Sequence, residues 1–130
     1  MTVKPVISIV YDDPSVREGT MDLLNSMGFI VETFQRARDF LNSKSVDSAS
    51  VLITDMRMPE MTGLELHNHL VVSGKAVPTI LITAFPDERD RARALRAGVL
   101  CYLAKPFNAN ELLACIKSAL ESGKTDARRS

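Results

Sequence analysis

The sequence has no excess of either charge: Lys and Arg together number 16, and Asp and Glu together number 16. Balanced charge gives no electrostatic reason to expect binding to nucleic acid or to a membrane surface. No apolar run approaches the roughly 20 residues that span a bilayer, and the N-terminus lacks a signal-peptide pattern, so we expect a cytoplasmic protein. The two cysteines, Cys101 and Cys115, form no Cys-x-x-Cys motif. We therefore predict buried, reduced thiols rather than a disulfide or a metal site.

The length and composition fit one globular domain. At 130 residues, with 45% hydrophobic and 25% charged residues, the chain is long enough to bury a core of its own. It contains no internal repeat and no low-complexity tract. We expect the domain to span residues 1–122, and residues 123–130 to form a frayed tail or the beginning of a linker.

Five short apolar segments, most of them rich in β-branched residues, predict β-strands. They span residues 6–10, 29–34, 51–55, 77–83 and 100–104. A predicted helix follows each strand, over residues 14–27, 36–42, 64–72, 86–98 and 108–120, whereas residues 43–50 are polar and loop-like. This alternation predicts an α/β fold: a five-stranded parallel sheet with five helices on its two faces, in the flavodoxin-like strand order 2-1-3-4-5.

Two signals compete for the start of the first helix. Asp13 followed by Pro14 fits an N-cap with proline at the first helical position, whereas Ser15 with Glu18 fits a capping box. Two further capping pairs predict the starts of later helices: Thr62 with Glu65, and Asn108 with Glu111.

Polar side chains follow four of the predicted strands at the points where those strands end: Asp12, Asp13, Asp55, Thr83 and Lys105. In a parallel sheet these strand ends share one edge, where ligands bind. Carboxylates that gather with a single lysine repel one another unless a cation lies between them, and Mg²⁺ typically takes one or two carboxylates, waters and a phosphate oxygen. The set therefore suggests phosphoryl transfer to an aspartate. Taken alone, Asp55 could equally end a strand or begin a turn.

These motifs resemble the receiver domains of response regulators in two-component signalling. The resemblance covers about residues 3–120. It depends on an acidic cluster after the first strand, on Ile-Thr-Asp-Met-Arg-Met-Pro-Glu-Met-Thr-Gly around Asp55, on Ile-Thr-Ala at the fourth strand and on Lys-Pro-Phe after the fifth. The sequence of the Asp55 segment, together with Asp-Pro-Ser-Val-Arg near the start, is most similar to the FixJ-type subgroup. The resemblance implies that Asp55 is phosphorylated and that Asp12, Asp55 and the backbone carbonyl of Arg57 bind Mg²⁺. It also implies that Thr83 and Lys105 contact the phosphoryl group.

Tyr11 departs from the family pattern, because it occupies the first of two positions that are usually acidic. That first position usually acts through water or the outer shell of the metal, and the loss of an outer-shell group typically costs ~10–100-fold in metal affinity. We therefore expect weaker Mg²⁺ binding and slower phosphorylation. Asp13 could compensate as a further metal ligand, but we predict that it acts mainly as a helix cap.

The resemblance also implies a switch and a set of partners. Thr83 and Tyr102 match the family's switch pair, and the peptide between Lys105 and Pro106 is expected to be cis. A sensor histidine kinase would supply the phosphoryl group. Phosphorylation would alter the surface formed by the fourth helix, the fifth strand and the fifth helix, through which the chain could form a homodimer. DNA would be bound only by an effector domain that this chain lacks.

Two rival interpretations remain open. The first is a phosphorylation-independent module for protein interaction, because Tyr11 breaks the acidic pair. The second is a phosphatase with an aspartyl-phosphate intermediate, although such enzymes use an acid two residues after the nucleophile, where this chain has Arg57. The main interpretation is a signalling phosphoacceptor that promotes its own phosphorylation and dephosphorylation but is not otherwise an enzyme.

Several other residues receive no role in this interpretation. His67 and His69 are two apart on a predicted helix, so we expect both to be solvated rather than to chelate a metal together. Met56, Met58 and Met61 could either pack within the loop around Asp55 or line a contact surface for a partner. Arg89, Arg91, Arg93 and Arg96 are expected to form a solvated helix face.

Overall fold

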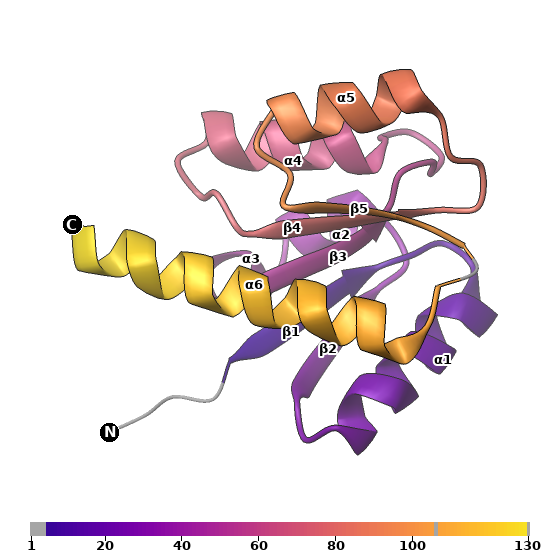
Figure 1. Cartoon of the computed structure of the whole chain (residues 1–130), viewed down its shortest axis with the longest axis horizontal. Coiled ribbons are helices and arrows are strands. Elements are labelled where there is room, and N and C mark those ends of the chain that lie inside the picture. The colour runs from indigo at the N-terminus through magenta and orange to yellow at the C-terminus, as the bar shows by residue number, and fades with distance from the viewer. Residues whose placement is uncertain (1–4, 106, 130) are drawn as a thin grey trace.

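The computed structural model of the protein describes residues 5–105 and 107–129, and the side chains of residues 5–105 and 107–121. Strands and helices alternate along the chain (Figure 1). The strands are β1 (Val6–Val10), β2 (Ile30–Phe34), β3 (Val51–Asp55), β4 (Thr79–Thr83) and β5 (Cys101–Ala104). The helices are α1 (Pro14–Ser26), α2 (Ala37–Leu41), α3 (Ser45–Ser48), α4 (Gly63–Val72), α5 (Glu88–Arg96) and α6 (Ala109–Arg129).

The sheet confirms the predicted fold. Its five strands are all parallel and follow the order β2-β1-β3-β4-β5. Val10 pairs with Thr54, Asp55 with Ile82, and Thr83 with Ala104, so the ends of β1, β3, β4 and β5 lie level with one another. Order and register together place the residues that follow these strands at one edge.

Helices cover both faces of the sheet (Figure 1). Because side chains alternate along a strand, one face of the sheet packs against α1 and α6 and the other against α2, α3, α4 and α5. The first core contains Tyr11, just after β1, together with residues of the strands and of α1 and α6: Ile7, Ile9, Val51, Ile53, Ile80 and Ile82, and Leu24, Leu112 and Ile116. The second face carries two clusters. One includes Val10, Leu52, Phe40, Leu66 and Leu70, and the other includes Leu81, Leu64, Met56 and Ala94.

Local hydrogen bonds set where the helices begin. Asp13 is the N-cap of α1, with Pro14 in the first turn, and its side chain accepts from the backbone N–H groups of Ser15 and Val16. This settles the competition between the two predicted caps in favour of Asp13. The other two predicted capping pairs are both formed: Thr62 with Glu65 before α4, and Asn108 with Glu111 before α6.

Several predicted element assignments and boundaries were wrong. The polar segment 43–50 contains the four-residue helix α3, whose Val46 is buried against the second face of the sheet. The last helix runs to Arg129 rather than ending near Leu120, so residues 123–129, predicted to be frayed, are helical. The division between domain and tail at residue 122 remains a prediction. The strands β2, β4 and β5 each begin one or two residues later than predicted, because strand ends depend on pairing with a neighbour.

His67 is also a correction, because it is 4% exposed and not solvated. Its Nδ1 lies 2.9 Å from the Thr79 hydroxyl oxygen and its Nε2 donates to the Ala97 carbonyl oxygen at 3.1 Å. The imidazole therefore connects α4 with the start of β4 and the end of α5. His69 is exposed, as predicted.

Both cysteines are free. Cys115 is buried and Cys101 is half-buried, and burial together with a hydrogen bond to Cys101 raises the pKa of the Cys115 thiol to about 12. Thiols with so high a pKa remain protonated and unreactive. Among the residues that the structure describes, no helix has both the length and the apolar character needed to cross a membrane.

Candidate functional site

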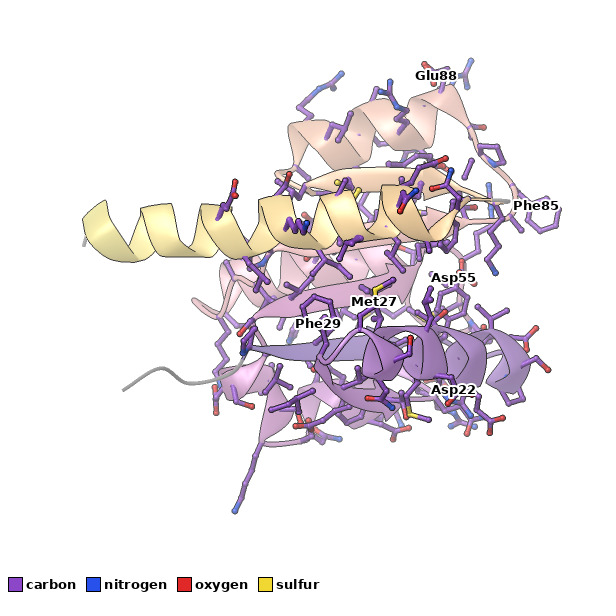
Figure 2. All side chains as sticks on the ribbon, turned by 60° about the horizontal axis from the view of Figure 1, so that its bottom comes forward. Asp22, Met27, Phe29, Asp55, Phe85 and Glu88 are labelled. Atoms are coloured by element: carbon purple, nitrogen blue, oxygen red, sulfur yellow. The ribbon has the colours of Figure 1, made fainter. Side chains whose placement is uncertain are left out.

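The predicted site residues meet at the carboxyl edge of the sheet. Asp55 ends β3 and Thr83 ends β4, whereas Asp12 and Lys105 lie just beyond β1 and β5. Backbone hydrogen bonds hold this edge, since Lys105 N donates to Thr83 O at 2.9 Å. Figure 2 shows Asp55 at this end of the molecule, on the same side as Phe85 from the loop between β4 and α5. The topology therefore brings together side chains that are up to 93 residues apart in the sequence.

Asp55 is half-buried, and its carboxylate accepts few hydrogen bonds. Its Oδ1 accepts a hydrogen bond of 3.1 Å from the backbone N–H of Arg57, and no described residue donates to its Oδ2. Burial raises the pKa of Asp55 above its ordinary value, and the charge of Asp12 adds to the rise, against the opposing effects of the Arg57 N–H and Lys105. A carboxylate whose anion is incompletely stabilised retains nucleophilic character.

Gly63 holds the Asp55 segment against α4, a role that its sequence context as a turn residue did not indicate. Its N–H donates to the Met56 carbonyl oxygen at 3.0 Å. A Cβ at this position would lie 2.4 Å from the Asp55 carbonyl oxygen and 2.7 Å from Leu81 Cδ2. The absence of a side chain therefore permits the first turn of α4 to approach the backbone of the candidate nucleophile.

Tyr11 lies inside the site rather than beside it. The residue is 1% exposed, and Lys105 Nζ lies 4.8 Å from the centroid of its ring, within the range of a cation–π contact. No carboxylate in the described part of the chain lies within ion-pair distance of Lys105. Burial, followed by the carboxylates of Asp55, Asp12 and Asp13, raises the pKa of the Tyr11 hydroxyl. The phenol therefore remains neutral in a site that also contains carboxylates.

The two acids after β1 have different positions. The Asp13 carboxylate caps α1, with its Oδ1 2.8 Å from Ser15 N, which agrees with the predicted capping role. Asp12 is half-buried and lines a hollow of about 210 Å³ together with residues of the loops after β2 and β3. The other lining residues are Gln35, Arg36, Met58, Pro59 and Glu60.

The donor set at this edge fits Mg²⁺ only in part. No group of three or more His, Cys, Asp or Glu side chains gathers as a metal site in residues 5–105 and 107–121. Asp12 and Asp55 are close enough for each charge to act on the other, and Mg²⁺ requires no more than one or two carboxylates with waters and a phosphate oxygen. Asp12, Asp55 and the Arg57 carbonyl could therefore hold the ion, with Asp13 engaged elsewhere.

Two hydroxyl groups hold the loop between β4 and α5. Thr83 is 1% exposed, and its Oγ1 accepts from the backbone N–H of Phe85 at 3.0 Å. The Tyr102 hydroxyl oxygen accepts from the backbone N–H of Asp87 at 3.3 Å, and Asp87 is the N-cap of α5. The two residues of the predicted switch pair thus bond to the same loop. Their switching role remains a prediction, and the predicted cis peptide at Pro106 lies outside the described residues.

An ion-pair chain that the sequence did not indicate joins the Asp55 segment to α5. Arg57 Nη2 lies 3.4 Å from Asp90 Oδ2, and Arg93 Nη2 lies 3.2 Å from Asp90 Oδ1. The side chain of Asp90 is largely buried between these two arginines, at 14% exposed. On α5, Asp90 and Arg93 therefore contact each other, and Asp90 also contacts Arg57, so these two side chains are not surrounded by solvent alone.

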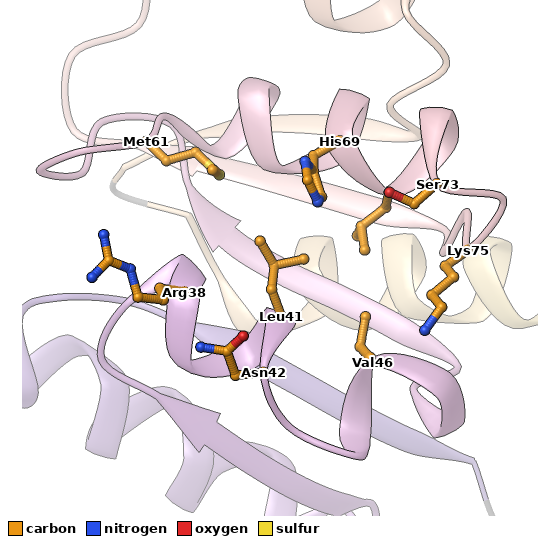
Figure 3. A pocket seen from close by; sticks show the side chains of 9 residues that line it. Arg38, Leu41, Asn42, Val46, Met61, His69, Ser73 and Lys75 are labelled. Atoms are coloured by element: carbon orange, nitrogen blue, oxygen red, sulfur yellow. The ribbon is translucent and has the colours of Figure 1, made fainter.

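A second cavity, of about 400 Å³, lies away from the sheet edge, between α2, α3 and α4 (Figure 3). Leu41 and Val46 contribute apolar surface, and Arg38 and Lys75 lie at its rim (Figure 3). Both of these cations have acidic partners, at Glu60 and Asp47. None of Asp12, Asp55, Thr83 or Lys105 lines this cavity, so its size does not make it the site of the predicted chemistry.

Comparison with known proteins gives matches over nearly the whole chain. The sequence model described as Response regulator receiver domain matches residues 7–117. The chain is 39% identical over 116 residues to response regulator protein TodT of Pseudomonas putida, a match that covers 89% of this chain and 51% of TodT. It is 31% identical over 128 residues to transcriptional regulatory protein FixJ of Bradyrhizobium diazoefficiens, covering 98% of this chain and 62% of FixJ. The chain thus spans about half the length of curated relatives such as TodT.

Solved structures agree with this assignment. The response regulator StyR has a TM-score of 0.89 and 39% identity, over 98% of this chain and 64% of StyR. The structure of FixJ-N has a TM-score of 0.84 and 33% identity, over 92% of this chain and 96% of that one.

Proposed function

Because the chain belongs to the response regulator receiver domain family, we propose that it accepts a phosphoryl group on Asp55 from a sensor histidine kinase. The observation that carries this proposal is the meeting of Asp55, Asp12, Thr83 and Lys105 at one sheet edge. Receiver domains of this family receive their signal from such kinases, and they are generally Mg²⁺-dependent. We place the protein in the cytoplasm, where it would meet the kinase.

The chemistry follows from the environment of Asp55. A carboxylate oxygen attacks the phosphorus of a phosphohistidine, the bond from phosphorus to nitrogen breaks, and an acyl phosphate forms on Asp55. The Arg57 N–H orients the carboxylate through Oδ1, which leaves Oδ2 for the attack. The Lys105 ammonium and the Thr83 hydroxyl donate to phosphoryl oxygens. Asp12, Asp55 and the Arg57 carbonyl would hold Mg²⁺, which supplies charge neutralisation when bound.

The signal leaves the site through contacts that already exist. The Thr83 hydroxyl oxygen accepts from Phe85 N while its own proton has no acceptor in the described part of the chain, so it can donate to the phosphoryl group. A Thr83 that moves toward the phosphoryl group would draw Phe85 with it. Arg57 and Tyr102 connect the same loop and α5 to the site. The surface of α5, β5 and α6 would respond and could form a homodimer.

The output is proposed to be control of transcription. Relatives that match this chain include transcriptional regulators, and they are longer than the matched region. A DNA-binding segment outside the chain described here would therefore carry the effector function, whereas this domain would supply the phosphorylation-dependent surface.

Intact-mass measurement after incubation with Mg²⁺ and acetyl phosphate tests the proposal. We expect one phosphate adduct on the wild-type chain and none on Asp55→Asn. We also expect Tyr11→Asp to raise Mg²⁺ affinity by ~10–100-fold, because it restores an outer-shell acid. A wild-type chain that gains no adduct, and whose thermal stability does not respond to Mg²⁺, would contradict the proposal.

That negative result would favour a second function, a module for protein interaction that does not depend on phosphorylation. The observation behind this alternative is that the buried Tyr11 stands at a usually acidic position, and that the Asp13 carboxylate is engaged in capping α1. A single measurement distinguishes the two functions, namely whether the phosphate adduct appears on Asp55.

A further inference from the structure

The hydroxyl group of Tyr11 has no partner in the described part of the chain. It is one of two buried side-chain oxygens without a hydrogen bond there, and the other is the hydroxyl of Ser8 in the middle of β1. A buried hydroxyl without a partner is unfavourable, so such a group at a functional edge requires an explanation. Ser8 lies away from the sheet edge, whereas Tyr11 directly follows β1 and precedes the candidate metal ligand Asp12.

The surroundings of the Tyr11 side chain are those of a ligand site. Lys105, the proposed hydrogen-bond donor to the phosphoryl group, lies over the ring with its Nζ 4.8 Å from the ring centroid. Asp12 directly follows Tyr11, and Asp55 ends β3, the strand that pairs with β1. A tyrosine hydroxyl is a hydrogen-bond donor, but no acceptor in residues 5–105 and 107–121 reaches this one.

We propose that the Tyr11 hydroxyl donates a hydrogen bond to the phosphoryl group on Asp55, beside the Lys105 ammonium. This inference rests on the proposed function. A phosphoryl group brings oxygens that are strong acceptors, and it would form on Asp55 at the end of β3, the strand that pairs with β1 just before Tyr11. Tyrosine at this position removes one negative charge that would repel the incoming phosphoryl group and adds one donor. The site would thus depend on Tyr11 for part of the stabilisation that Mg²⁺ otherwise supplies.

The test uses two matched variants that each delete one buried, unpartnered hydroxyl. Tyr11→Phe keeps the ring and its contact with Lys105, whereas Ser8→Ala makes the same kind of change away from the edge. Two quantities are measured on the whole chain: the formation and loss of the phosphate adduct by intact mass, and the rise in Tm on adding beryllium fluoride with Mg²⁺. Beryllium fluoride serves as the phosphoryl mimic, because its fluorine atoms accept hydrogen bonds.

We expect Tyr11→Phe to form the adduct more slowly or to lose it faster by about tenfold, the worth of one hydrogen bond to a charged group. Its response to beryllium fluoride should shrink, while the Tm of the unliganded variant equals or exceeds that of the wild type. Ser8→Ala should retain both wild-type responses. An unchanged adduct lifetime, formation rate and beryllium fluoride response in Tyr11→Phe would overturn this inference alone. A wild-type chain that takes no phosphate would overturn the proposed function and this inference together.

Discussion

Replacement of Gly63 by alanine should disturb Asp55 directly, because the two residues are in backbone contact. A Cβ at residue 63 would lie 2.4 Å from the Asp55 carbonyl oxygen, 3.1 Å from its carbonyl carbon and 2.7 Å from Leu81 Cδ2. Ordinary Cβ contacts begin at 3.4 Å, so α4 or the Asp55 backbone would have to move by about 1 Å. The Leu81 side chain can rotate, but the carbonyl group cannot move without its strand.

Two opposing effects set the magnitude. Overpacking of this kind costs about 1–3 kcal/mol, whereas glycine to alanine in a helix contributes up to about 1 kcal/mol of stability. We therefore expect Gly63→Ala to lower the free energy of unfolding by about 1–2 kcal/mol. A displacement of ~1 Å at the nucleophile should slow phosphorylation on the order of 100-fold, more than the loss of stability alone would do.

Gly19→Ala is the control for helix propensity. Gly19 lies inside α1, and a Cβ there would have no neighbour within 4 Å. We expect this variant to be more stable by about 0.5–1 kcal/mol and to be phosphorylated at the wild-type rate. Urea unfolding gives the stability of both variants, and intact mass after incubation with acetyl phosphate gives the rate. A Gly63→Ala protein with wild-type stability and a wild-type rate would refute the argument from close approach.

Two further predictions concern buried titratable side chains. Since burial raises the pKa of Asp55, its ionised form destabilises the folded state, so Asp55→Asn should be more stable than wild type near neutral pH. This gain in unfolding free energy should disappear as the pH falls through the Asp55 pKa toward 3.8. Urea unfolding measures it, and a gain that does not depend on pH would contradict the prediction. His67→Ala should lose about 2–4 kcal/mol of unfolding free energy, because it leaves a cavity and deprives the Ala97 carbonyl oxygen of its donor. The control His69→Ala changes an exposed residue and should stay within about 0.5 kcal/mol of the wild type. Equal stability of the two variants would disprove the role of His67.

Local signals in the sequence were sufficient for much of the fold. The β-branched runs predicted five strands, because a strand buried on both faces needs a short, continuous apolar segment. The caps at Asp13, Thr62 and Asn108 were also predicted, since each depends on hydrogen bonds to residues two or three positions away. The right-handed crossover rule left few strand orders once the alternation was recognised, and the flavodoxin-like order predicted among them is the one observed.

Contacts between distant segments could not be predicted in this way. The Val46 side chain stabilises α3 by packing under the sheet, although its own segment is polar. His67 belongs to a helix whose pattern did not distinguish it from His69, and only the positions of Thr79 and Ala97 decide which imidazole is buried. The packing of β4 and the end of α5 against α4 supplies those partners, and no local pattern encodes it.

The same division applies to the candidate site. The sequence by itself determined which residue types follow the strands, and therefore that Asp55, Thr83 and Lys105 gather at one edge. The tertiary structure alone decided that Lys105 lies over the Tyr11 ring, that the Tyr11 hydroxyl lacks a partner, and that Gly63 touches the Asp55 backbone. The physical reason is that the directions and distances of side chains from different strands depend on the register and twist of the sheet, which no single segment contains.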